Sequence, residues 1–171
     1  MIRSSLIFFW CVLAAAPADR IFVGQVLPTV SGETLTGKEL ELPAADAGSS
    51  RILVFSFTKK ASGDSKLWNE HMTRDFGSRG PAVFRVIFLE SVPKVFRSMA
   101  ISGIKSGLPE ALWDRTLLVY QGEDAWKFRL VVTSDRHSYL VLLDGQGRVE
   151  WMSSRAFNEA EYADLKKLLG R

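Results

Sequence analysis

The sequence predicts an α/β domain in which helices cover both faces of a mixed central sheet and an N-terminal hairpin extends that sheet. Two observations carry this prediction. From residue 52 onward, apolar stretches with the composition of strands alternate with segments of helical period, which is the order of crossover units with parallel pairing. The chain has 171 residues, 47% hydrophobic and 24% charged, which suits one domain with a substantial core.

The first half of the chain supplies the hairpin, a central strand and a helix. Short apolar stretches separated by glycines predict a strand and a small hairpin over residues 20–43, and small residues predict a loop over 44–50. Residues 52–58 are rich in β-branched and aromatic side chains, so they predict a central strand. Three apolar residues spaced by four predict the apolar stripe of the next helix, which Gly77 ends: Trp68, Met72 and Phe76.

The second half continues the alternation. Further strands are predicted over four apolar stretches: 82–90, 116–122, 138–144 and 148–152. The last two flank Gly145-Gln146-Gly147, which predicts a hairpin with a three-residue loop. Helices are predicted after Pro93 and over 123–132. A last helix follows Asn158, which suits an N-cap because Glu161 stands three residues further on.

The first eighteen residues have the order of a secretory signal peptide. Arg3 precedes an apolar run of eleven residues, Leu6 to Ala16, and small side chains at Ala16 and Ala18 occupy the positions that a signal peptidase reads. We therefore expect cleavage after Ala18, leaving residues 19–171 as a single domain that is periplasmic or secreted. Eleven apolar residues are too few to span a bilayer, which takes about twenty. The alternative is an uncleaved segment that associates the protein with a membrane surface.

Cysteine usage and charge exclude several functions. The single cysteine, Cys11, lies inside this N-terminal segment, so a chain cut after Ala18 has no thiol for disulfides, catalysis or metal binding. The 22 basic and 19 acidic residues give a net charge of +3, and the longest basic runs are Lys59-Lys60 and Lys166-Lys167. A nucleic-acid-binding protein would show a basic stripe interleaved with aromatic residues. The charges therefore predict a solvated surface and no nucleic-acid partner.

The order of elements and the leader VGQVLPTVSGETLTGKELELP resemble the thioredoxin-like superfamily over residues 22–170, above all its peroxidases and exported thiol reductases. The resemblance implies a three-layer α/β/α sandwich. In these families the first core strand enters a loop that carries paired reactive cysteines, and those positions fall here on Ala61 and Asp64. The cis-proline that faces the cysteines falls on His137 or Ser138. The resemblance therefore implies that both hallmarks of thiol chemistry are missing.

Three stretches are similar to a narrower, cysteine-poor family that includes the mitochondrial assembly chaperone for the membrane sector of F-type ATP synthase. They are FSFTKKASGDSKLW, RTLLVYQGEDAWKFRL and RHSYLVLLDGQGRVEWMSSRAFNEAEYADL. This resemblance implies a non-catalytic, chaperone-like role in the binding or assembly of membrane or envelope proteins. It implies a protein partner, with no cofactor and no small-molecule substrate. The mitochondrial client is not carried over, because a bacterial-type export signal precedes the domain.

The junction after the strand 52–58 holds the candidate binding residues. Lysines at this strand exit could hold an anion or a partner's carboxylate, since the N-terminus of the next helix adds a positive dipole; the alternative is two solvated charges. Asp64 suits an N-cap by its spacing. We expect a groove beside residues 58–66 and the turn 137–138 to contact an extended segment of a partner. The candidate residues are Thr58, Lys59, Lys60, Asp64, Trp68, His137 and Ser138.

The alternative function is an enzyme related to peroxiredoxins or thiol reductases, with non-standard active-site residues. Peroxide reduction requires a thiolate that becomes sulfenic acid, which a cysteine-free domain lacks. A hydrolase built on Ser62 or Ser65 would need a base and an orienting group, and the only histidines are His71 and His137. A copper site from these histidines and Met72 would lack soft thiolates. We therefore expect no catalytic residue and no metal.

Overall fold

The computed structural model describes residues 19–43 and 48–170. The expected signal peptide and its cleavage site, together with residues 44–47 of the expected loop, lie outside this part of the chain.

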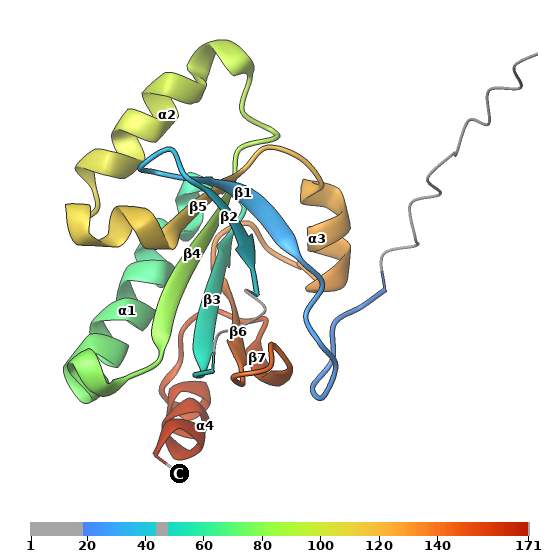
Figure 1. Cartoon of the computed structure of the whole chain (residues 1–171), viewed down its shortest axis with the longest axis vertical. Coiled ribbons are helices and arrows are strands. Elements are labelled where there is room, and N and C mark those ends of the chain that lie inside the picture. The colour runs from blue at the N-terminus through green and yellow to red at the C-terminus, as the bar shows by residue number, and fades with distance from the viewer. Residues whose placement is uncertain (1–18, 44–47, 171) are drawn as a thin grey trace, which may run out of the picture.

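Within the described residues, a mixed seven-stranded sheet forms the middle layer (Figure 1), with the strand order β2-β1-β5-β4-β3-β6-β7. The strands are β1 (Val30–Thr34), β2 (Glu39–Leu42), β3 (Arg51–Ser56), β4 (Ala82–Phe88), β5 (Thr116–Val119), β6 (Tyr139–Leu143) and β7 (Val149–Ser153). Strand β4 pairs in parallel with β3 and with β5, and the other pairings are antiparallel. Residues 52–55 of the central strand β3 are all apolar and buried, as expected for a strand with both faces covered.

Helices pack on both faces of the sheet, as the sequence predicts. The α-helices are α1 (Ser62–Phe76), α2 (Lys94–Ser106), α3 (Glu123–Arg129) and α4 (Glu159–Leu169). Three short 3-10 turns join them to the strands: η1 (Lys59–Ala61), η2 (Gly77–Arg79) and η3 (Glu110–Arg115). None of the helices in the described part of the chain is both long enough and apolar enough to cross a membrane.

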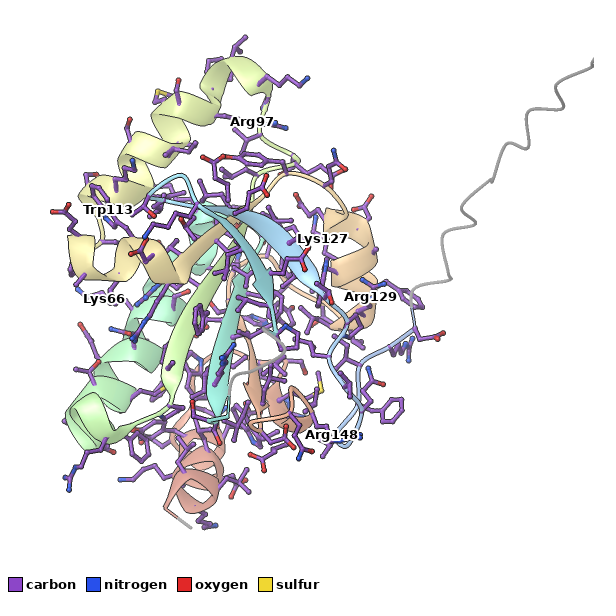
Figure 2. All side chains as sticks on the ribbon, in the orientation of Figure 1. Lys66, Arg97, Trp113, Lys127, Arg129 and Arg148 are labelled. Atoms are coloured by element: carbon purple, nitrogen blue, oxygen red, sulfur yellow. The ribbon has the colours of Figure 1, made fainter. Side chains whose placement is uncertain are left out.

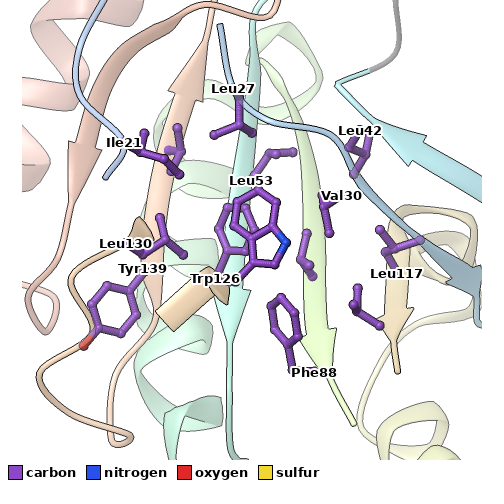
Figure 3. Packing of buried hydrophobic residues seen from close by; sticks show 14 of the residues in the cluster. Ile21, Leu27, Val30, Leu42, Leu53, Phe88, Leu117, Trp126, Leu130 and Tyr139 are labelled. Atoms are coloured by element: carbon purple, nitrogen blue, oxygen red, sulfur yellow. The ribbon is translucent and has the colours of Figure 1, made fainter. Parts of the chain in front are cut away.

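Alternate residues of β3 point to opposite faces of the sheet and belong to two separate hydrophobic clusters. Ile52 and Val54 pack against α1 and α4, where Trp68 and Tyr162 are buried. Leu53 and Phe55 face α3 and the N-terminal segment in the larger cluster of Figure 3, and the ring of Phe55 stacks on Trp126 with centroids 5.1 Å apart. The period-2 pattern of the central strand thus fixes which helices lie on which face.

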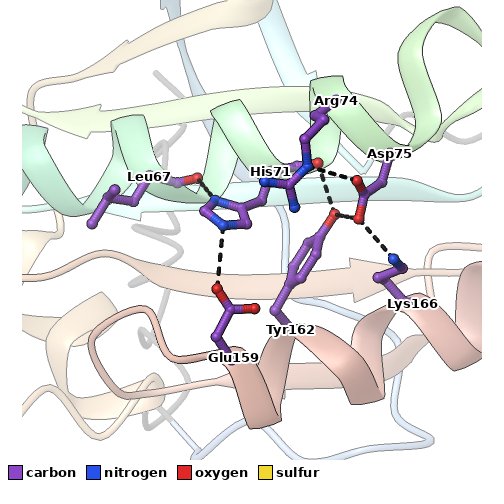
Figure 4. Close-up of polar contacts among 7 residues, drawn as sticks. All are labelled: Leu67, His71, Arg74, Asp75, Glu159, Tyr162 and Lys166. Atoms are coloured by element: carbon purple, nitrogen blue, oxygen red, sulfur yellow. Dashed lines mark hydrogen bonds and ion pairs between the residues drawn. The ribbon is translucent and has the colours of Figure 1, made fainter.

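Polar contacts join α1 to α4 on one face of the sheet (Figure 4). The hydroxyl of Tyr162 lies 2.7 Å from the carbonyl oxygen of His71 and 3.0 Å from Oδ2 of Asp75, and its proton can serve one of them at a time. Asp75 also accepts from Nε of Arg74 and from Nζ of Lys166, each at 2.8 Å. These bonds hold the carboxylate of Asp75 between the two helices.

Helix α2 is the least embedded helix. Its half-buried residues Ile101 and Ile104 pack near β4 and β5, on the same face of the sheet as α1, and none of its side chains is fully buried. Three large apolar side chains on its outer side are between 53% and 79% exposed: Val95, Phe96 and Met99.

The segment 24–27 pairs with residues 147–149, at the start of the edge strand β7. The N–H of Gly24 donates to the carbonyl of Val149 at 2.7 Å, and the N–H of Val149 donates to Gln25 at 2.8 Å. Leu27 donates in the same way to Gly147 at 2.9 Å. The start of the described chain therefore acts as a short additional strand on this edge.

The predicted N-cap of the last helix is confirmed, because the side chain of Asn158 accepts from the N–H of Glu161 at 3.0 Å. The predicted hairpin also forms, and Oδ1 of Asp144 accepts from the N–H groups of Gln146 and Arg148 at 2.8 Å each. The strand predicted over 52–58 ends at Ser56, because Thr58 caps the 3-10 turn η1.

Candidate functional site

Three loops meet at the carboxyl end of β3. They comprise residues 57–61, residues 133–138 before β6, and residues 154–157 before α4; together we call them the three-loop surface. Asp64, in the first turn of α1, holds the second and third of these loops against the helix that follows the first. Its Oδ2 accepts from the N–H of Ser138 at 2.8 Å and its Oδ1 from the N–H of Phe157 at 2.7 Å. One carboxylate thus satisfies two backbone donors on separate loops.

The prediction that Asp64 caps α1 is wrong. The N-cap of α1 is Ala61, whose side chain makes no capping hydrogen bond. The helix needs no side-chain cap at this point because η1 runs directly into it, and Thr58 caps η1 by accepting from the N–H of Lys60 at 3.2 Å. The carboxylate of Asp64 is therefore free to reach the other two loops.

Three serine hydroxyls form a closed triangle beside Asp64. Oγ of Ser56 lies 3.2 Å from Oγ of Ser65 and 3.3 Å from Oγ of Ser138, and the last two atoms are 2.5 Å apart. Neither histidine contacts these serines: Nε2 of His137 lies 3.1 Å from the carbonyl of Ser154. Because a serine nucleophile needs a base within hydrogen-bond reach, this triangle has the character of a neutral structural network.

The loop 133–138 is held in place from both sides. From the sheet, the hydroxyl of Tyr139 accepts from the N–H groups of Thr133 and Ser134 at 2.9 and 3.1 Å. From η1, Thr58 donates to the carbonyl of Asp135 at 2.6 Å. Nζ of Lys60 lies 2.9 Å from Oδ2 of Asp135, and this hydrogen bond lowers the pKa of the Asp135 carboxyl. The two segments that the sequence predicts to lie together are therefore in direct contact.

The seven candidate residues divide into three groups. Lys59 is exposed and forms no ion pair within the described residues. Thr58, Lys60 and His137 also reach the surface, where the ring of His137 packs on Tyr139 with centroids 5.0 Å apart. Asp64 and Ser138 lie beneath and hold the loops. The third group is Trp68 alone.

The expectation that Trp68 contacts a partner is wrong. The side chain of Trp68 is fully buried. Its ring packs edge-on against Phe157, with centroids 5.0 Å apart, and against Trp151. Trp68 therefore supports the three-loop surface from the core. The helical period contained this information, because Trp68 belongs to the apolar stripe that predicts α1.

One backbone donor of the expected groove is already occupied. The N–H of Ser138 is a donor that an extended partner could have used, and Asp64 already occupies it. The sequence did not indicate Ser56, Asp135 or Phe157 as members of the site. No local pattern could have found them, because the bond from Phe157 to Asp64 joins residues 93 positions apart.

The exposed charges of the three-loop surface are mainly positive. Its loops contain four basic residues and one acidic residue, Asp135, which pairs with Lys60. The basic residues are Lys59, Lys60, Arg136 and Arg155. Among the residues that the structure describes, no three histidine, aspartate or glutamate side chains gather closely enough to hold a metal ion. The chemistry that this surface offers is the binding of carboxylates or other anions.

Comparisons with known proteins identify the fold. No family model matches the chain, and no curated protein matches it. Solved structures do match. The thioredoxin domain of a thiol-disulfide oxidoreductase from Bacteroides vulgatus is 18% identical and superposes with a TM-score of 0.59 over 87% of this chain and 99% of that chain.

Two further structures agree. A protein from Chlorobium tepidum described as a thiol:disulfide interchange protein DsbE is 17% identical, with a TM-score of 0.59 over 86% of this chain and 94% of that one. A peroxiredoxin-like protein from Aquifex aeolicus is 14% identical, with a TM-score of 0.55 over 90% of each chain. The chain therefore has the thioredoxin-like α/β fold that the sequence predicts. At the junction after β3 it carries Ala61 and Asp64, with no cysteine.

Proposed function

We propose that this protein is a non-catalytic, exported thioredoxin-fold protein that binds membrane or envelope proteins and assists their assembly. The proposal rests mainly on the position and the hydrogen bonds of Asp64. It stands where the resemblance places a reactive cysteine, and both its carboxylate oxygens are engaged by the backbone of neighbouring loops. The residue at the reactive position thus serves to fix a surface. The enzyme alternative would require an activated nucleophile. Within residues 19–43 and 48–170 there is no thiol, and neither histidine forms a hydrogen bond with a serine hydroxyl.

The partner is proposed to carry an acidic segment. Lys59, Arg136 and Arg155 are exposed on the three-loop surface, and the N-terminus of α1 adds a positive dipole. Because the N–H of Ser138 is occupied by Asp64, recognition here depends on side chains rather than on strand pairing. The assembly role rests on the similarity to the cysteine-poor family, and export rests on the order of residues 1–18.

Photo-cross-linking in cells tests the proposal. A photoreactive residue is placed at position 59 of the full chain, and in a control chain at Glu70, which is exposed further along α1. We expect adducts with membrane or envelope proteins from position 59, and their loss when Arg136→Glu is added, with no such adducts from position 70. Identical adducts from both positions would contradict a partner site at the three-loop surface.

Turnover measurements test the non-catalytic part. The Cys11→Ser variant of the full chain is assayed for reduction of insulin disulfides and hydroperoxides, and for ester hydrolysis. We expect none of these activities above the rate without protein. Reduction by this thiol-free chain, or hydrolysis that disappears in Ser65→Ala, would instead establish the enzyme alternative.

A further inference from the structure

Five large apolar side chains lie exposed on one side of the molecule, where the segment 19–28 meets the end of α3. They are between 42% and 62% exposed, and we call them the N-terminal patch: Phe22, Val23, Val26, Phe128 and Val131. The two segments form one surface, because the N–H of Ile21 donates to the carbonyl of Arg129 at 2.9 Å. The guanidinium of Arg20 also lies over the ring of Phe128, 5.8 Å from its centroid. A contiguous apolar surface of this kind marks an interaction site.

Val131 is held in this surface by an unfavourable backbone. Its φ is 53°, in the left-handed region, where a β-branched residue is a strong outlier. The N–H groups of Val131 and Val132 donate to the carbonyls of Phe128 and Lys127, which is the pattern that ends a helix and normally places glycine where Val131 stands. An exposed valine in that position adds little to the core. Its apolar side chain is therefore available for a contact outside the domain.

Positive charge surrounds the patch. Residues 19–28 and 127–134 contain three basic side chains and one acidic side chain, Asp19. Of these, Lys127 is paired with Glu123 at 2.6 Å. Arg20 is exposed, whereas Arg129 is half-buried with its guanidinium 5.2 Å from the centroid of the Trp126 ring. Arg148 adds another charge from the neighbouring hairpin and donates to the carbonyl of Gly24 at 3.3 Å. Figure 2 shows Arg129 and Arg148 on either side of the N-terminal segment.

The sequence that leads into the patch supplies the argument for its occupant. The apolar run Leu6–Ala16 ends only a few residues before Arg20 and Phe22. Wherever that run meets a bilayer, the patch is the first part of the folded domain to reach the same membrane. Aromatic and aliphatic side chains flanked by arginines also fit the boundary between acyl chains and anionic headgroups. We infer that the N-terminal patch rests on an anionic lipid bilayer.

The second exposed apolar surface of the molecule provides a matched control. Val95, Phe96 and Met99 of α2 are between 53% and 79% exposed, against 42% to 62% in the patch. Helix α2, however, packs on the opposite face of the sheet from α3. A protein that adsorbs to lipid through any apolar surface would use both. A protein that rests on the N-terminal patch holds α2 away from the bilayer.

Depth-dependent fluorescence quenching tests the inference in the full chain. An environment-sensitive label is placed through Val23→Cys or, as the control, through Met99→Cys, each combined with Cys11→Ser. The proteins are mixed with vesicles of phosphatidylglycerol and phosphatidylcholine that contain brominated acyl chains. We expect the label at position 23 to be quenched at least threefold more than the label at position 99. We also expect Arg20→Glu, or 500 mM NaCl without any substitution, to reduce that quenching by at least half.

Three results would overturn the inference. Equal quenching at positions 23 and 99, including none at either, would contradict the inference that the N-terminal patch faces the bilayer and α2 does not. Equal quenching on vesicles of phosphatidylcholine alone would remove the role of anionic headgroups. A label at position 23 that is shielded only when envelope proteins are added would assign the patch to a protein partner. The three-loop surface begins at Thr133, two residues after Val131, so cross-linking from position 59 remains the separate test of that surface.

Discussion

Asp64 holds two loops against α1 with one carboxylate, so its replacement has a defined cost. In Asp64→Ala, the N–H groups of Ser138 and Phe157 lose a charged acceptor. We expect the free energy of unfolding to fall by about 2–4 kcal/mol. This is less than twice the roughly 1.5–3 kcal/mol of one hydrogen bond to a charged group, because Asp64 is only partly buried and water can replace some of the lost bonding. Asp64→Asn keeps one acceptor and should lose about half as much. Urea unfolding measures both variants, and Ser62→Ala, an exposed change in the same turn, is the control expected to stay within about 0.5 kcal/mol. An Asp64→Ala midpoint equal to that control would contradict this account.

Val131 allows a prediction in the opposite direction. Val131→Gly relieves the left-handed conformation, which costs a residue with a β-carbon roughly 1–2 kcal/mol, while the extra freedom of glycine in the unfolded chain offsets part of the gain. We expect a net stabilisation of about 0.5–1 kcal/mol in thermal or urea unfolding. Val132→Gly is the control, because Val132 packs against the core and its loss should destabilise the fold. A loss of stability in Val131→Gly would show that the side chain contributes to the folded domain itself.

The contact between α1 and α4 depends on the ionisation of Asp75. The hydrogen bond from Arg74, followed by those from Lys166 and Tyr162, holds the pKa of the Asp75 carboxyl well below its usual range. A depressed folded pKa stabilises the protein above the unfolded value of about 3.9, and this stabilisation is lost as the pH falls through the folded pKa. We therefore expect Asp75→Asn to destabilise the domain at pH 7, with a difference from the parent chain that shrinks below about pH 4.

Urea unfolding at pH 7, 5, 3.5 and 2.5 measures this difference. The control is Asp164→Asn, because Asp164 is exposed and pairs only with Lys167 on its own helix, so its effect should be small at every pH. If the loss of unfolding free energy in Asp75→Asn stays constant with pH, its cause is altered packing or hydrogen-bond geometry rather than the charge of Asp75.

Elements differ in how completely local sequence determines them. The N-cap of α4 could be predicted because Asn158 and Glu161 are three residues apart and interact within one turn. Helix α2 could be predicted as a helix, but its period could not show which apolar residues face outward, since that depends on how the helix sits on β4 and β5. Val95, Phe96 and Met99 consequently look like core residues in the sequence and are exposed in the structure.

At the scale of the whole molecule, the order of strands and helices sufficed to predict the thioredoxin-like fold, because hydrophobic periodicity and turn residues are local signals. The site could be predicted only in part. The sequence placed residues 58–66 beside the turn 137–138, which is correct, and it showed that the chemistry of cysteine is missing there. It could not show that Asp64 would close the junction, because its partners Ser138 and Phe157 are brought to it by folding over 74 and 93 positions.

The pairing of residues 24–27 along β7 has a consequence for crowded conditions. Exposed sheet edges are templates on which other chains can add strands and grow into fibres. Here the start of one rim, at Val149, is already paired with the protein's own backbone. The opposite rim, β2, is only four residues long and carries Glu39 and Glu41, so neighbouring copies repel one another there. Both rims are thereby made poorer templates for added strands, and we expect this to slow the growth of insoluble ribbons at high concentration.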